Sequence, residues 1–241
     1  MPEFSRDEVV IQYEEAGAGP VLLLCAPGGM RSEARFWRES PADPEQAPVW
    51  IDPLAALSDA FRVIAMDQRN AGASSAPITA ADGWDSFAAD QLALLDHLGV
   101  ERFSVMGGCI GCAFALGLAK AAEGRVSALV LQNPIGRSAG NAPLFQRMFQ
   151  EWADQRGVSG ETAAVFGEHM FGGDFVFSVS RDFVSGLPCP ALVLPGDDDF
   201  HPRATALEIA ALAPRAELFD GWRRDKTTTA AVVRNFLTAA Q

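Results

Sequence analysis

The chain has 241 residues, of which 49% are hydrophobic, and it carries a formal net charge of -12. This length suits one α/β domain over residues 1–241, and the excess of acid argues against nucleic-acid or anionic-membrane partners, because both need a basic surface. No segment approaches the ~20 consecutive apolar residues of a membrane span, and the N-terminus lacks the basic and apolar regions of a secretory signal. Four cysteines without such a signal predict reduced thiols and a cytoplasmic location.

In chain order, residues 4–14 alternate apolar and polar positions and predict an antiparallel edge strand. Short continuous apolar runs follow, and runs of this kind are typical of strands buried on both faces of a parallel sheet. These runs cover residues 21–25, 62–66, 102–106, 128–131 and 191–194. Helical spacing of apolar residues predicts helices between or after them, at 85–98 and 227–239. The alternation predicts a doubly wound α/β fold with a mostly parallel sheet flanked by helices.

Two regions interrupt this rhythm. Residues 31–52 are rich in proline and charge and predict a long loop beside the carboxyl edge of the sheet. Residues 136–187 are far longer than a usual crossover and contain helical stretches at 144–155 and 161–170. Because ligands of open α/β sheets bind at the carboxyl ends of the strands, we expect residues 136–187 to form a small helical cap over a site there.

The segment 105–114, "VMGGCIGCAF", joins a predicted strand to a predicted helix through Gly-Gly-Cys-Ile-Gly. This context is typical of a nucleophile elbow, in which flanking glycines permit a sharp, strained turn and the central side chain stands above the sheet. The free amides and dipole at the helix N-terminus would stabilise a thiolate on Cys109. The pattern therefore predicts a site centred on Cys109.

With this elbow, the chain resembles the α/β-hydrolase family. Supporting stretches are "CAPGGMRS" (25–32), "DQRNAGAS" (67–74) and "GDDDFHP" (196–202), which occur in the family's order. The resemblance implies Cys109 in place of the usual serine, similar to dienelactone hydrolases and polyhydroxyalkanoate synthases. It also implies oxyanion donors at the backbone amides of Ile110 and Gly29. Met30 is the alternative to Gly29 in the early loop, and we also expect it to line the substrate pocket. The Gly-x-x-Asp spacing implies Asp199 as the catalytic acid, followed by Asp198.

The family pattern also requires a histidine before the final helix, but Trp222 follows the glycine in that segment. Of the three histidines, His97 lies on the helix that precedes the elbow strand, away from the carboxyl edge. His169 falls in the predicted cap, where we expect it to line the substrate pocket. His201 lies two residues beyond Asp199, and we expect it to serve Cys109 as base or cation. Its alternative role is that of a loop residue that caps the next helix.

Other interpretations of these residues stay open. Cys109 and Cys112 have the spacing of a redox pair, although the glycines favour an elbow and Cys112 is interpreted as a packing residue. No Cys/His cluster has zinc-ligand spacing, and the run 197–199 of three aspartates is interpreted as a solvated turn, so no metal is expected.

The leading prediction is a cysteine-dependent enzyme that forms an acyl-Cys109 intermediate with a small-molecule ester, lactone or thioester, without a cofactor. Hydrolysis and acyl transfer are both compatible with it. A non-catalytic ligand-binding protein and a lyase or cyclase are the alternatives. The sequence leaves a homo-oligomer open.

Overall fold

The computed structural model describes residues 2–43 and 45–241. The described residues form one eight-stranded sheet with the order β1-β2-β4-β3-β5-β6-β7-β8. Its strands are β1 (Glu3–Arg6), β2 (Val9–Ala16), β3 (Val21–Cys25), β4 (Arg62–Met66), β5 (Phe103–Gly108), β6 (Val126–Gln132), β7 (Ala191–Leu194) and β8 (Ala216–Leu218). The strands from β4 to β8 in this order are parallel, whereas β1 and β2 pair antiparallel. The fold prediction of a mostly parallel, doubly wound sheet is confirmed.

The amino-terminal prediction needs a correction. Residues 4–14 do not form one strand, because the chain turns at Asp7, which has a positive φ of 54°. Aspartate tolerates this left-handed conformation better than most residues, so the chain folds back as the β1–β2 hairpin. Strand β2 then pairs with β4 inside the sheet, and β1 is the edge strand. The predicted runs at 21–25, 62–66 and 191–194 coincide with β3, β4 and β7.

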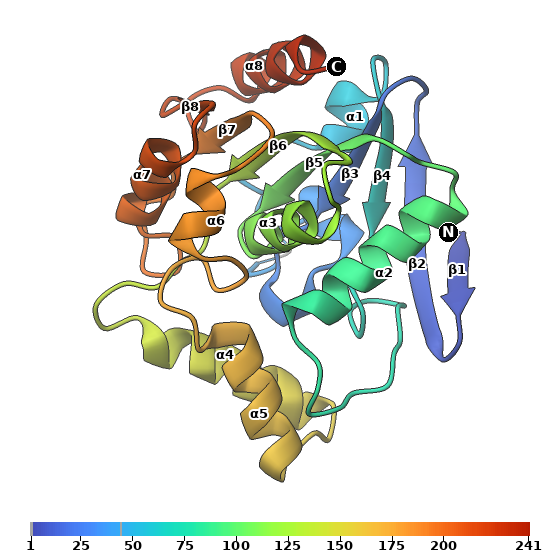
Figure 1. The fold of residues 1–241 in the computed structure, drawn as a ribbon, viewed down its shortest axis with the longest axis vertical. Coiled ribbons are helices and arrows are strands. Elements are labelled where there is room, and N and C mark those ends of the chain that lie inside the picture. The colour runs from blue at the N-terminus through green and yellow to red at the C-terminus, as the bar shows by residue number, and fades with distance from the viewer. Residues whose placement is uncertain (1, 44) are drawn as a thin grey trace.

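Helices cover both faces of the sheet (Figure 1). On one face α2 (Trp84–His97), α3 (Gly111–Ala121) and α7 (Arg203–Leu212) bury their apolar residues in a large core. On the other face α1 (Pro53–Leu57) and α8 (Lys226–Ala239) cover a second core. Leu23, Leu24 and Val105 are fully buried between these layers, which explains their continuous apolar sequence.

The segment between β6 and β7 contains α4 (Ala142–Gln155), α5 (Gly160–Phe171) and α6 (Arg181–Ser185). Helices α4 and α5 pack against each other and lie beyond the carboxyl ends of the strands, apart from the helices that flank the sheet (Figure 1). Helix α6 instead packs against α7. This arrangement supports the proposal of a cap within residues 136–187, carried by α4 and α5. Helix α4 also contacts the short 3-10 helix η1 (Gly29–Arg31), which follows β3.

None of the helices in the described ranges combines the length and apolar character needed to cross a membrane.

Candidate active site

The turn between β5 and α3 holds Cys109 in a strained conformation. Cys109 has a φ of 56°, a left-handed value that costs a non-glycine residue on the order of 1–3 kcal/mol. A Cβ at Gly107 would collide with the carbonyl oxygen of Gly111, and a Cβ at Gly111 would collide with that of Cys25. The Cys109 amide donates to the Gln132 carbonyl at 3.0 Å, which ties the turn to β6. The glycines are therefore required by close backbone contacts, as an elbow demands.

The surroundings of Cys109 favour its thiolate. Burial opposes ionisation, but the charge and the side-chain contact of His201 outweigh it, together with the backbone amides of Ile110 and Gly28. The pKa of Cys109 is consequently lowered from its ordinary value. Burial has the opposite result elsewhere: it raises the pKa of Cys25 to about 12 and that of Cys189 to about 11. Of the four cysteines, Cys109 alone has the electrostatic character of a nucleophile.

Cys112 lies on the first turn of α3 and is buried. Its thiol donates to the carbonyl oxygens of Gly107 and Gln132, both at 3.2 Å. Burial raises the pKa of Cys112 well above its ordinary value. These contacts fix the backbone beneath the elbow, which agrees with the interpretation of Cys112 as a packing residue.

His201 is the imidazole that faces Cys109. Burial lowers the pKa of His201, but the thiolate charge of Cys109 and the hydrogen bond with Asp198 raise it to about 9. Its Nε2 atom is buried and has no conventional hydrogen-bond partner among the described residues. Charge and side-chain contact with Cys109 both favour the protonated imidazole, so this arrangement would suit a thiolate–imidazolium pair.

Asp198, rather than Asp199, is the carboxylate that holds His201. His201 Nδ1 lies 2.7 Å from Oδ1 of Asp198 and 2.9 Å from Oδ2. The backbone amides of Phe200 and His201 also donate to Oδ1, each at 3.0 Å. The hydrogen bond with His201 lowers the pKa of Asp198, so this carboxylate stays ionised. An acid and a histidine three residues apart thus form their pair within one turn.

The structure pairs His201 with Asp198 and not with Asp199, which the motif spacing favours as the acid. The Asp199 carbonyl oxygen accepts a hydrogen bond from Nδ2 of Asn141 at 2.9 Å, which links the loop to the start of α4. Two residues is too short a separation for its side chain to turn back onto His201, whereas the turn from Asp198 to His201 brings residues three apart together. The sequence contained this signal in the spacing of Asp198 and His201, but a count from the glycine favours Asp199.

Trp222 occupies the segment in which the family pattern places its histidine. Its side chain is buried, and Nε1 donates to the Pro195 carbonyl at 2.8 Å. Arg223 donates to the same carbonyl at 3.2 Å and to Oδ1 of Asn133 at 2.8 Å. The segment before α8 therefore braces the loop that follows β7, and that loop carries both Asp198 and His201.

A pocket of about 610 Å³ lies at the carboxyl edge of the sheet and is lined by Cys109 and His201. Its surface is mostly apolar and includes Gly28, Gly29 and the proline-rich loop predicted at residues 31–52. The Gly28 amide contacts the sulfur of Cys109, and Gly29 has a φ of 63° in the next position. Met30 is buried and lines a neighbouring hollow with Met148 instead.

The structure does not bring His169 to this pocket. His169 lies on α5 and its Nδ1 is 2.9 Å from the carbonyl oxygen of Asp82. It lines a different hollow, with Lys120 and Ser178. The predicted place of His169 in the pocket of Cys109 is therefore not found, because α5 turns the histidine toward the start of α2. His97 also lies away from the site and packs against Phe4 at the sheet edge, with the rings tilted and 5.0 Å between their centroids.

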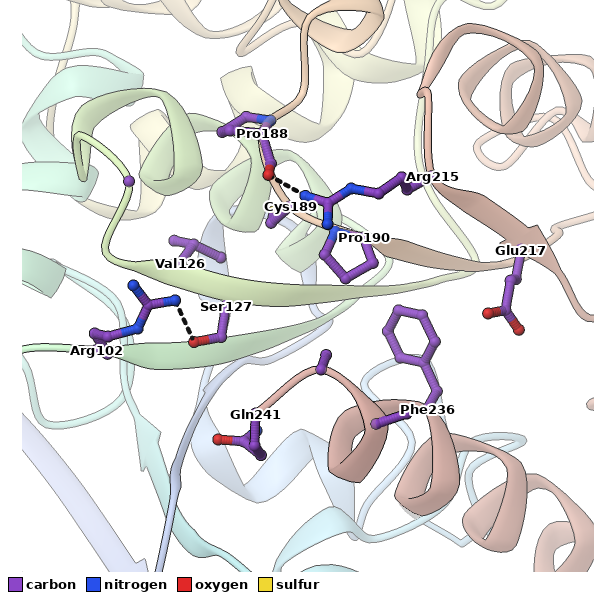
Figure 2. Close-up of a pocket in the computed structure, with 13 residues that line it drawn as sticks. Arg102, Val126, Ser127, Pro188, Cys189, Pro190, Arg215, Glu217, Phe236 and Gln241 are labelled. Atoms are coloured by element: carbon purple, nitrogen blue, oxygen red, sulfur yellow. Dashed lines mark hydrogen bonds between the residues drawn. The ribbon is translucent and has the colours of Figure 1, made fainter.

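A second hollow of about 620 Å³ opens at the amino-terminal ends of the strands (Figure 2). Figure 2 shows that Arg102 donates a hydrogen bond to Ser127 and that Arg215 donates one to the Pro188 carbonyl. Cys189 lies beside Pro188 in the same view. Its described lining residues include no histidine, and the raised pKa of Cys189 disfavours a thiolate there. The candidate catalytic groups therefore lie at the opposite edge of the sheet, around Cys109.

No three His, Cys, Asp or Glu side chains within residues 2–43 and 45–241 are arranged to hold a metal ion. This includes the aspartate run 197–199, in which Asp198 is taken up by His201 and the Asp199 carbonyl by Asn141.

Comparisons with known proteins agree with this fold. The putative carbamate hydrolase RutD of Azorhizobium caulinodans is 32% identical over 140 residues, which are 58% of this chain and 47% of that protein. Haloalkane dehalogenase 2 of Mycobacterium bovis is 29% identical over 51% of this chain and 38% of its own length. The chain thus spans less than half the length of these curated relatives.

Solved structures match over nearly the whole chain. The enol-lactonase from Burkholderia xenovorans LB400 has a TM-score of 0.69 at 18% identity, over 98% of this chain and 100% of that one. A hydrolase from Pseudomonas aeruginosa PA01 has a TM-score of 0.70 at 21% identity, over 98% and 97%. At these identities the likeness shows a shared fold. A family profile described as alpha/beta hydrolase fold matches residues 21–183, so this chain belongs to the alpha/beta hydrolase fold family.

Proposed function

We propose that this protein is a cysteine-dependent hydrolase that cleaves a small ester, lactone or thioester through an acyl-Cys109 intermediate. The observation that carries this proposal is that Cys109, on a strained elbow, lines one pocket with His201, whose Nδ1 is held by Asp198 at 2.7 Å. The lowered pKa of Cys109 and the raised pKa of His201 support it. A nucleophile with an adjacent base, oriented by a third group, is the arrangement that covalent catalysis requires. Cys109, His201 and Asp198 supply these three parts. The resemblance of the elbow to that of dienelactone hydrolases points the same way.

In the first step the Cys109 thiolate attacks the substrate carbonyl carbon and a C–S bond forms. The carbonyl oxygen gains negative charge, which the backbone amide of Ile110 and an amide of the Gly28–Gly29 turn would stabilise. The bond to the leaving group then breaks, and the leaving oxygen or sulfur takes the proton of His201. Asp198 holds Nδ1 of His201, which leaves Nε2 free to face the reacting atoms.

In the second step neutral His201 accepts a proton from water as the water attacks the thioester carbonyl. The C–S bond breaks, the acid product leaves, and the thiolate–imidazolium pair returns. An alcohol or amine in place of water would give acyl transfer by the same proton movements. We favour water because one curated relative is named as a putative carbamate hydrolase and one structural neighbour as a hydrolase.

This proposal accounts for the absence of a histidine before the final helix, where Trp222 follows the glycine instead. His201 can serve from the loop after β7 because a thiol needs less help to ionise than a hydroxyl. The strained φ of Cys109 also favours a catalytic role, since such strain clusters at functional sites.

The test is to mix the protein with an activated ester at pH 7 and to measure the intact mass and the release of the leaving group. We expect acyl adducts on Cys109 and turnover that a Cys109→Ala variant reduces by at least roughly a thousandfold. Cys112→Ala is the matched control and should still acylate. Normal turnover by Cys109→Ala would contradict the covalent mechanism and favour a lyase or cyclase, whereas an inert Cys109 would favour a binding protein.

A further inference from the structure

The start of cap helix α4 contacts the turn that carries Asp198 and His201. Asn141 is the N-cap residue of α4, and its side chain is buried. Its Nδ2 donates to the Asp199 carbonyl at 2.9 Å and to the Gly136 carbonyl at 2.8 Å. One amide group therefore joins the turn to the stem of the cap, across 58 positions of the chain.

Asn141 does not use its side chain as an N-cap residue commonly does. An N-cap asparagine usually accepts a hydrogen bond from an amide in the first turn of its own helix. In this structure Asn141 caps no such amide, and its Oδ1 accepts from the Ser138 amide at 2.9 Å instead. The cap stem thus orients the side-chain amide, and its N–H groups are directed to carbonyls outside α4.

One turn further along α4, Phe145 makes a second contact with the same turn. Its ring lies edge-on to that of Phe200, with 5.4 Å between the centroids, and Phe200 directly precedes His201. Phe145 is buried and is itself held by Phe171 and Phe177, with centroids at 5.5 and 4.6 Å. Aromatic pairs at such distances contribute stability beyond their buried area. A polar and an apolar contact therefore both tie the turn to the cap.

The hydrogen bonds inside the turn and the contacts with the cap have different consequences. The bonds between Asp198 and His201 fix these two residues relative to each other. They do not fix the distance of the pair from Cys109, which the sheet holds separately. Trp222 braces the start of the loop at the Pro195 carbonyl, whereas the cap contacts lie directly beside the histidine.

We propose that Asn141 and Phe145 are positioning residues, through which the cap holds His201 in place for the reaction. This inference rests on the proposed function for the roles of His201 and Cys109. Neither positioning residue is among the described residues that line the pocket, whereas Leu144 on the same helix is. Helix α4 thus forms a wall of the pocket with one face and holds the base with another.

The first experiment measures iodoacetamide alkylation of Cys109 against pH, by mass, and needs no turnover. Asn141→Ala and Phe145→Leu should each move the midpoint upward by about half to one pH unit, because a displaced His201 stabilises the thiolate less. Phe149→Leu is the matched control. Phe149 is also buried on α4, and its aromatic contacts among the described residues stay within the cap, so the midpoint should remain that of the wild type.

The second experiment repeats these substitutions in a His201→Gln background. If the cap acts through His201, Asn141→Ala and Phe145→Leu should now move the midpoint by less than about 0.3 pH unit, the error within which independent effects add. Helix α4 also carries Arg147 and Glu151 to the wall of the pocket. A shift caused by displacement of their charges would persist in this background.

Turnover separates this inference from the proposed function. With an activated ester, Asn141→Ala and Phe145→Leu should lower kcat about tenfold and leave KM within about twofold, since they act on the base. If the protein turns over no ester but shows the midpoint shifts, the hydrolase proposal fails and the positioning role stands. An unshifted midpoint in both variants, an equal shift in Phe149→Leu, or a shift that persists in the His201→Gln background would overturn the positioning role.

Discussion

Two turns meet at the pocket, and they are held in place in different ways. The elbow between β5 and α3 lies between buried parallel strands, and its glycines allow no side chain where the backbone of Cys25 passes. The loop between β7 and α7 is held by its own hydrogen bonds, and the Asp198 side chain is 53% exposed. The sheet therefore fixes the proposed nucleophile, whereas a short local turn holds the proposed acid and base. In the proposed mechanism, this difference explains how a histidine can serve from an unusual position in the chain.

Of the substitutions at these two turns, His201→Gln should have the largest effect on kcat/KM. The variant removes the cation that lowers the pKa of Cys109 and the group that moves protons, so we expect kcat/KM to fall roughly a hundred- to ten-thousandfold. The measurement is the rate of leaving-group release from an activated ester. His97→Gln, which changes a histidine far from the pocket, should remain near the wild-type rate. A His201→Gln variant with nearly normal turnover would mean that another group acts as base.

Substitutions of Asp198 and Asp199 test which of the two aspartates orients His201. Asp198→Asn keeps the shape of the side chain but weakens its charged hydrogen bond with His201, so kcat/KM should fall about ten- to a hundredfold. Asp199→Asn is the matched control, because this side chain makes no hydrogen bond to His201. Its effect on the same rate should stay below about twofold, as for other exposed positions. A larger loss of kcat/KM in Asp199→Asn than in Asp198→Asn would instead support Asp199 as the acid, as the motif spacing predicts.

The smallest effect, on stability, should come from the hydrogen bond between Trp222 and the Pro195 carbonyl in the loop after β7. Trp222→Phe removes the hydrogen bond to the Pro195 carbonyl and should lower the free energy of unfolding by about 1 kcal/mol beyond the loss of ring area. Trp152→Phe is a suitable control, because Trp152 is equally buried and its Nε1 has no partner among the described residues. Denaturant unfolding of both variants gives the difference. Equal destabilisation would show that the Pro195 contact contributes little.

Much of the fold could be predicted because buried parallel strands leave a clear pattern. The runs that became β3, β4 and β7 are apolar on both faces, and the glycines around Cys109 mark the elbow in the sequence. The β1–β2 hairpin was missed because its turn depends on one residue with positive φ, Asp7, inside an alternating segment.

The site was less accessible to sequence reasoning where it depends on contacts across the fold. His201 lines one pocket with Cys109, as the sequence led us to expect, but spacing alone did not distinguish Asp198 from Asp199. The orientation of His169 depends on how α5 packs, which periodicity does not specify.

The central claim is the thiolate–imidazolium pair, and the pH dependence of Cys109 reactivity tests it most directly. The pKa of Cys109 is lowered, so the ion pair should form below the thiol's ordinary pKa and persist until His201 loses its proton near pH 9. Turnover should fall as pH rises through about 9, because the leaving group then lacks its acid, and these values belong to the coupled pair.

The decisive measurement is the rate of Cys109 alkylation by iodoacetamide against pH, in the wild type and in His201→Gln. The account predicts that Cys109 reacts faster than a free thiol at neutral pH and that its titration midpoint moves upward in the variant. A wild-type midpoint at or above that of a free thiol, unchanged by His201→Gln, would contradict it.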